Sequence, residues 1–355
     1  MISRPTQLVF TALTAVAVVW SCPGTAPAVE AAPRPRPIYP RFDLTYFPRV
    51  SHQGLIGFRP VAIARSAKGP ELVSATSQLF TYAFGWIKDG TLSAAEAPAF
   101  ADIEQCVFNL NAYVQPESDG EHGKIGINGA APCVIRTIRP FDWNGRLRKW
   151  FPKADWVRHA GRSYARVQLQ TTPKESVPFV LFAADDRTLV CSPEPEVRAL
   201  LDRLAARKPA PAPSSGWAEI DREFLAIFFD NRETPLFAGQ PLSVSKPGIE
   251  ELKALADSAQ TAALSLSVCD RSGIRVTVIA KDDRRAKIVT YAIRRLLEMA
   301  DEDLKANTDP GPFAVMAKES LTRTLIERKG CQVFWTTSAE GNVIELLLSF
   351  IRGPV

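Results

Sequence analysis

The sequence predicts an α+β fold made of two loosely duplicated modules of antiparallel hairpins, with helices packed on one face. Three observations support this prediction. Short β-rich runs occur in pairs around turn residues, segments with helical periodicity follow them, and a Pro/Ala/Ser run at residues 208–215 divides the chain. Each half then reads strand, helix, hairpin, helix, hairpin. The two halves share this order rather than residue identities.

The first half supplies elements that can be placed one by one. Apolar runs and alternation predict strands at 54–58, 105–115, 133–138, 164–169, 179–182 and 188–191, and helical spacing predicts helices at 71–86 and 141–151. Residues 117–129 are polar and Gly-rich, which is typical of a loop or hairpin tip. Ser192 is expected to N-cap a further helix that runs to about Ala206.

The second half follows the same order. Strands are expected at 224–229, 261–268, 274–279, 333–337 and 343–350, and helices at 247–259 and 313–328. Asp282 is expected to cap a long helix between these elements. One face of that helix is apolar and carries Val289, Ile293, Leu296 and Ala300.

Composition excludes several classes of protein. The 355 residues are 46% hydrophobic and 23% charged, which is an ordinary globular mixture. Lys and Arg number 43 against 38 Asp and Glu, and a net charge of +5 is too small for a histone-like protein. We therefore expect no nucleic-acid partner. With 3 His and 6 Cys, a His-rich metal enzyme is not expected either, and we predict no metal and no cofactor.

The N-terminus has the pattern of an export signal. The apolar run at residues 8–20 follows Arg4 and is shorter than the roughly 20 residues that span a bilayer. Cleavage after Ala28 or after Ala31 fits the sequence, lipid attachment at Cys22 in a lipobox-like context is an alternative, and an uncleaved anchor is a third. The expected location is therefore exported: periplasmic, membrane-tethered or secreted.

These features divide the chain into five segments. They are a signal peptide at 1–31, a Pro-rich tether at 32–45, a first α+β module at 46–207, a linker at 208–215 and a second α+β module at 216–355. The alternating prolines of the tether favour extended polyproline II, which buries little surface.

Five cysteines remain after the signal peptide, and none of them forms a C-x-x-C pair. An odd number leaves at least one thiol outside any intramolecular disulfide. Cys106 and Cys133 lie in neighbouring predicted strands and form the expected disulfide. The alternative is that all five are small buried hydrophobic residues.

Two short stretches resemble secreted planctomycete-type bacterial proteins of uncharacterised function. The first is a strand-turn-strand segment leading into a helix at 179–194 (FVLFAADDRTLVCSPE), and the second is GLIGFRP at 54–60. Together they cover under a tenth of the chain. The resemblance implies export and an α+β fold, and it carries no catalytic residues.

Motifs for catalysis are absent from the sequence. There is no G-x-S-x-G, and the Gly-rich run at 120–124 lacks P-loop spacing. The acidic pairs 185–186 and 282–283 stand where a turn and a helix start already favour Asp. His52, His122 and His159 have no triad spacing. Whether the protein is an enzyme stays open, with the balance against it.

The strongest candidate surface is a basic segment at 136–162, in which eight cations and two acids give a charge of +6. Arg and Trp together can bind anionic or sugar-containing polymers through charge pairing and stacking. The candidate binding residues are Arg139, Trp143, Arg146, Arg148, Lys149, Trp150, Trp156 and Arg158. The alternative is that the tryptophans face the core and the arginines are merely solvated.

A second basic stretch at 281–295 is followed by acids that nearly cancel it, so we expect a solvated helix face there. The sequence therefore predicts an exported, envelope-associated protein that is a non-catalytic binding or structural module. Its expected partners are anionic lipid headgroups or envelope glycan. The alternative is a secreted hydrolase whose site is assembled from scattered residues.

Overall fold

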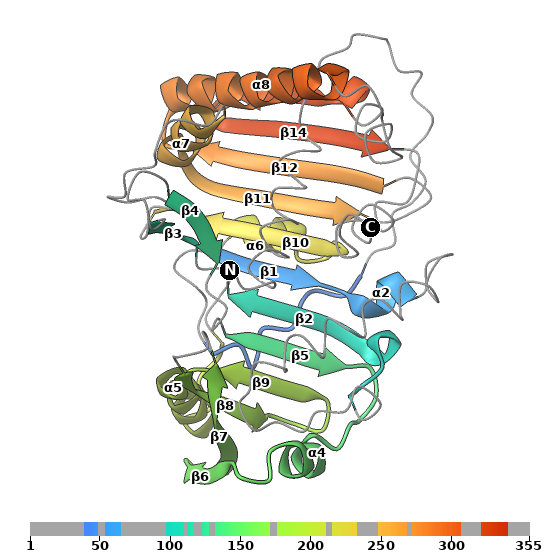
Figure 1. Ribbon diagram of the computed structural model, residues 1–355, viewed down its shortest axis with the longest axis vertical. Helices are drawn as coiled ribbons and strands as arrows, with labels where there is room; N and C mark the ends of the chain where they lie inside the picture. The colour runs from blue at the N-terminus through green and yellow to red at the C-terminus, as the bar shows by residue number, and fades with distance from the viewer. Residues whose placement is uncertain are drawn as a thin grey trace.

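The computed structural model describes residues 39–48, 54–64, 97–109, 112–116, 123–127, 132–170, 176–210, 215–232, 248–267, 272–306 and 321–339. Cys22, Cys269, the range expected to be a signal peptide, most of the range expected to be a tether and the elements expected at 71–86 and 343–350 lie outside these residues. The α+β class is confirmed, because a long antiparallel sheet is combined with helices (Figure 1).

Among the described residues, twelve strands form one continuous sheet with the order β13-β14-β12-β11-β10-β1-β2-β5-β9-β8-β7-β6, and β6 and β13 are its two outermost described strands. The strands are, in chain order, β1 Gly54–Phe58, β2 Ile103–Asn109, β5 Cys133–Thr137, β6 Asp155–His159, β7 Arg162–Gln170, β8 Ser176–Ala183, β9 Thr188–Ser192, β10 Leu225–Asp230, β11 Ala259–Ser267, β12 Ser272–Ala280, β13 Leu325–Lys329 and β14 Gln332–Ala339. A separate pair is formed by β3 Ala112–Pro116 and β4 Gly123–Ile127.

Helices connect and cover the strands. They are α2 Pro60–Ala64, the short 3₁₀ helix η1 Phe100–Asp102, α4 Trp143–Trp150, α5 Glu194–Ala205, α6 Ser215–Ile220, α7 Ile249–Ser258 and α8 Asp283–Ala306. Figure 1 places α8 at one end of the long axis and α4 at the other.

The strand register identifies the two faces of the sheet. Ile56 of β1 stands opposite Phe108 of β2 on one side and Ile227 of β10 on the other. Phe108 stands opposite Cys133 of β5, and Ile227 stands opposite Leu264 of β11. Because directly opposite residues share a face, the core under α4 and the core under α8 belong to one face, which we call the α8 face. Helices α5 and α6 pack on the other face, the α5 face. Helices thus cover both faces, and the expectation of one covered face was wrong.

Part of the range expected to be a tether belongs to the core of the sheet. Phe42 and Leu44 are buried in the core of the α5 face. Arg59 fixes this segment, since its buried guanidinium donates to the carbonyl oxygens of Pro40 and Asp221 at 2.5 and 2.9 Å and lies 3.9 Å from the Phe42 ring. Burial lowers the pKa of Arg59 to about 10. The expectation of a tether was therefore wrong for residues 42–45, because Phe42 and Leu44 are part of the core.

Two strands arise where other structure was expected. The helix expected at 313–328 is replaced at its end by β13, which forms a hairpin with β14 through Gly330 at a φ of 58°. Ile326 stands opposite Trp335, so cross-strand packing decides against the helix here. Residues 123–127, expected to be part of a loop or hairpin tip, form β4 because they pair with β3.

Two smaller differences concern the first half. Strand β6 was not expected, because an edge strand carrying Asp155 and Arg158 reads as polar loop. Ser192 is not the N-cap of α5: that position is held by Pro193 without a side-chain hydrogen bond, while the Ser192 hydroxyl donates to Glu196 at 3.0 Å.

Candidate functional site

Helix α4 carries the centre of the predicted basic segment. Asp142 caps its start by accepting a hydrogen bond from the Gly145 backbone N–H at 2.9 Å. Trp143, Leu147 and Trp150 follow at helical spacing and are all buried. This fixes which side of the helix faces the sheet and leaves Arg148 and Lys149 exposed.

The three tryptophans of the segment separate in the structure. Trp143 and Trp150 are 1% and 0% exposed and belong to the core of the α8 face. They cannot contact a ligand, so their inclusion among the candidate binding residues was wrong. Trp156 of β6 is half-buried, and the Arg148 guanidinium lies 4.0 Å from its ring, which is cation–π geometry.

The hairpin β6–β7 presents further cations. Its turn residues Ala160 and Gly161 have φ values of 47° and 79°, the left-handed pair that a two-residue type I′ turn requires. Arg158 before the turn and Arg162 after it are both exposed. Arg162 also donates to the Ala184 carbonyl oxygen at 3.0 Å, which holds it against the body of the sheet.

Helix α4 and the β6–β7 hairpin lie at the same end of the molecule (Figure 1). We define the basic surface as the cations at this end, namely Arg139, Arg146, Arg148, Lys149, Lys153, Arg158 and Arg162. The two acids of the segment are engaged locally: Asp142 caps α4, and Asp155 accepts from Arg166 at 2.7 Å. Within the segment, the cations outnumber these two exposed acids.

Arg136 does not belong to the basic surface. It lies within 3.3 Å of Glu104 and 3.2 Å of Asp43, and its side chain is only 21% exposed. The Arg187 guanidinium lies 2.5 Å from the same Glu104 carboxylate. This cluster ties β2, β5 and the segment around residue 43 together and has an evident structural role.

Cys106 and Cys133 are free thiols in the structure, so the expected disulfide is not formed. Cys106 stands opposite Ile135, and Cys133 opposite Phe108, which offsets the two cysteines by two residues. Such diagonal Cα atoms are about 7–8 Å apart, beyond the reach of an unstrained disulfide.

Cys191 stands directly opposite Cys133, and it is free as well. The Thr137 backbone N–H donates to the Arg187 carbonyl oxygen, so residues 137 and 187 form a hydrogen-bonded pair of the antiparallel ladder. Hydrogen-bonded pairs recur at every second residue, and Cys133 and Cys191 are therefore also a hydrogen-bonded pair. Side chains diverge at such pairs, and disulfide Cβ atoms need about 3.8 Å. Burial raises the pKa of all three thiols, which behave as small core residues.

The histidines do not form a site in the part of the chain that is described. His159 Nε2 lies 2.7 Å from an Asp202 carboxylate oxygen, and no serine or cysteine hydroxyl or thiol bonds to it there. His52 and His122 lie outside the described residues. The acidic pairs have the structural roles expected from the sequence: Asp185 accepts from the Arg187 N–H in a turn, and Asp282 from the Arg285 N–H at the start of α8.

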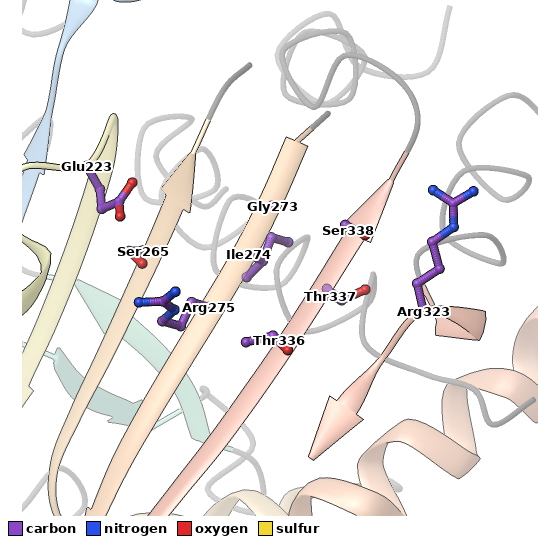
Figure 2. A pocket seen from close by; sticks show the side chains of 9 residues that line it. All are labelled: Glu223, Ser265, Gly273, Ile274, Arg275, Arg323, Thr336, Thr337 and Ser338. Carbon is purple, nitrogen blue, oxygen red and sulfur yellow. The ribbon is translucent and has the colours of Figure 1, made fainter. Parts of the chain in front are cut away.

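A second candidate is a hollow of about 190 Å³ on the α5 face of the second half. Ser265, Arg275 and Thr336 stand opposite one another across β11, β12 and β14 and form a polar row in its floor. Figure 2 shows the Arg275 guanidinium pointing toward Ser265 and Glu223, with Arg323 on the far side of β14.

The chemistry available in this hollow is limited. Glu223 is the one carboxylate of the described lining, which holds neither histidine nor cysteine. Glu223 and Arg323 already have interaction partners. The hollow can therefore accept a small polar or anionic molecule through Arg275 and the hydroxyls, but it offers no pair of groups for acid–base chemistry.

Two further observations apply to the described ranges. They contain no cluster of three or more His, Cys, Asp or Glu side chains that could hold a metal ion. None of their helices combines the length and apolarity that crossing a bilayer requires.

Comparison with known proteins gives little. No family model and no curated protein matches the chain. A solved structure described as "Structure of crystal form III of TP0453" is similar over 86% of this chain and 97% of its own, at 10% identity and a TM-score of 0.40. A likeness at that level supports no conclusion about this protein, and the resemblance to planctomycete-type proteins stays a prediction.

Proposed function

We propose that this is an exported, envelope-associated protein that acts as a non-catalytic binding module. Its basic surface would contact the anionic groups of lipid headgroups, with envelope glycan as the alternative partner. The observation that carries the proposal is the excess of cations at the α4 end: the segment places seven cations there, six exposed and Arg146 half-buried, against two exposed acids that cap a helix or bind Arg166. Anionic phosphates attract such an array over a Debye length.

Arg148 and Trp156 support the same proposal. A guanidinium stacked on an indole is held in place and still has donors free for a phosphate or carboxylate oxygen. Preorganisation of this kind lowers the entropy lost on binding.

We also propose that the two halves arose as loosely duplicated modules. Strands β1 and β10 pair antiparallel at the centre of the sheet, flanked by β2 and β5 on one side and by β11 and β12 on the other. In each half the first three strands of the sheet follow one another outward in sequence order, and the remaining strands follow in reverse order, β9-β8-β7-β6 in one half and β14-β13 in the other. A structure-based superposition of 54–137 on 225–280 tests this, and a fit no better than that of unrelated hairpin sheets would refute it.

Binding is tested by charge reversal at three exposed cations, Arg139→Glu, Lys153→Glu and Arg158→Glu, combined in one variant. We expect it to lose retention on vesicles of phosphatidylcholine and phosphatidylglycerol. The matched control reverses three exposed cations outside the basic surface, Lys208, Arg222 and Lys329, with the same change in net charge.

The outcomes separate the possible partners. Loss of retention on the vesicles in the first variant but not in the control supports the lipid partner. If neither the charge-reversal variant nor the control binds vesicles, and the charge-reversal variant alone loses retention on immobilised alginate, the surface would be assigned to a glycan. Equal retention of the variant and the control on both supports would refute the proposal.

Export is tested separately by cell fractionation. The full-length chain is expected outside the cytoplasm, and a chain lacking residues 1–31 inside it. Equal cytoplasmic retention of both would overturn this part of the proposal.

A further inference from the structure

Helix α8 has two sharply different sides. Ala286, Val289 and Ile293 are buried against β12 and β14 in the core of the α8 face. On the opposite side, four exposed residues fall within an arc of about 80° at 100° per residue. We call these the α8 stripe, and they are Arg284, Lys287, Tyr291 and Arg294.

Charge along α8 is segregated rather than cancelled. Residues 283–295 carry five cations and one acid, whereas residues 296–306 carry four acids and one lysine. Several acids are bound within the helix, since Lys305 Nζ lies 2.5 Å from Asp301 and Arg295 lies 3.0 Å from Glu298. Lys287 lies 3.8 Å from Asp283, whereas Arg284 and Arg294 have no ion pair among the described residues and are exposed to solvent.

The position of these cations works against helix stability. Arg284 and Arg285 lie in the first turn, where the partial positive charge of the helix dipole disfavours cations. A local conflict of this kind is expected where a residue serves binding rather than folding. Asp282 and Asp283 suit the start of α8, so the helix itself leaves only the two arginines beside them unexplained.

Tyr291 gives the stripe an apolar element. Its side chain is 69% exposed, and among the described residues only Leu325 is a comparably exposed large hydrophobic side chain. An exposed aromatic ring among Lys and Arg suits the headgroup region of a bilayer, where one end of the ring meets lipid and the hydroxyl meets water.

We infer that the α8 stripe is a second contact site for an anionic lipid bilayer, and this inference rests on the function proposed for the basic surface. The register places α4 and α8 on the same face of the sheet, and the two helices lie at opposite ends of the molecule (Figure 1). The two sites are tested as separate contacts, because the twist that accumulates along the sheet changes the direction in which its face points.

The test measures partition onto vesicles of phosphatidylcholine and phosphatidylglycerol. The α8 variant combines Arg284→Glu, Lys287→Glu and Arg294→Glu, and it is compared with the basic-surface variant and the charge-matched control already described. We expect the α8 variant to bind about tenfold or more weakly than the control, since each lysine or arginine near an anionic surface contributes about 1 kcal/mol. Tyr291→Ala should weaken binding severalfold with no change in charge.

Each result decides one question. If the α8 variant binds like the control while the basic-surface variant is weakened, this inference is overturned and the proposed function stands. If neither variant is weakened, both fail. Equal thermal midpoints of all proteins show that weaker binding does not come from unfolding. If Tyr291→Ala and the α8 variant both bind normally to phosphatidylglycerol vesicles, the stripe is a solvated helix face.

Discussion

Glu194 offers a quantitative test of how the first half of the protein is held together. Its carboxylate accepts hydrogen bonds from Arg166 at 2.7 and 2.9 Å, from the Tyr164 hydroxyl at 2.7 Å and from Arg198 at 2.8 Å. It thereby joins the start of α5 to β7. Arg166 above all, with Tyr164 and Arg198, holds the pKa of Glu194 at about 2 instead of its ordinary 4.5.

The perturbation is Glu194→Gln, which keeps the shape of the side chain and removes its charge. A pKa lowered from 4.5 to about 2 corresponds to at most about 3 kcal/mol of stability at neutral pH. The side chain is 17% exposed, and solvent screens part of this energy. We therefore expect a loss of about 1–2 kcal/mol in the free energy of unfolding at pH 7.

The sign of the pH dependence follows from the direction of the pKa change. Because the pKa is lower in the folded protein, the stabilisation is complete above about pH 4.5 and disappears as the pH falls toward 2. The difference between wild type and Glu194→Gln should shrink over that range.

Urea unfolding at a series of pH values, followed by circular dichroism, measures this difference. Glu250→Gln is the control, because Glu250 also lies in the first turn of a helix but is exposed and has no ion pair among the described residues. A difference for Glu194→Gln that stays constant from pH 7 to pH 3, or that equals the control, would refute the reasoning.

Three further predictions concern the core. Trp150→Ala should lower the free energy of unfolding by about 3–5 kcal/mol in urea, because the ring is fully buried; a loss below about 1 kcal/mol would contradict its placement. Gly57→Val should raise the fraction unfolded on heating, since a Cβ at this position would lie 2.9 Å from the Phe42 ring and 3.0 Å from Trp217; an unchanged thermal midpoint would argue against this packing. Peptide mapping after N-ethylmaleimide treatment of native protein should show Cys331 modified and the three buried thiols protected until urea is added; early labelling of Cys133 would contradict its burial.

Local sequence was sufficient to predict the elements whose pattern of apolar and turn residues fits only one type of secondary structure. The hairpin at 179–192 could be predicted because two apolar runs flank the turn at Asp185–Arg187. The Asp185 carboxylate stabilises this turn by accepting a hydrogen bond from the Arg187 backbone N–H. Helix α8 could be predicted because its apolar residues recur at helical spacing over many turns. In both cases the information lies within a few residues.

Elements decided by distant partners could not be predicted. Strand β13 is a strand because β14 pairs with it, and β4 because β3 does. Edge strand β6 carries too few apolar residues to be recognised without its neighbour β7. Strand pairing is set by hydrogen bonds between segments, and composition does not show it.

The candidate sites divide in the same way. The basic segment was visible in the sequence as a cluster of Arg, Lys and Trp. The packing of helix α4 on the sheet, which the sequence does not show, buries Trp143 and Trp150 and leaves Arg148 exposed. The solvated helix face expected at 281–295 agrees with the exposure of its cations, but summing charge along 281–303 does not show that the charge is segregated into two halves of one helix. A helical-wheel reading of that segment would have revealed the α8 stripe.

By itself, the sequence determined the α+β class, the mild net charge, and the positions of most helices and hairpins, because these depend on composition and on short-range periodicity. Only the tertiary structure decided which cysteines face one another, which tryptophans are buried, and that α4 and α8 share one face of a continuous sheet. The physical reason is register: a shift of one residue moves every side chain of a strand to the other face, and only the paired strands fix it.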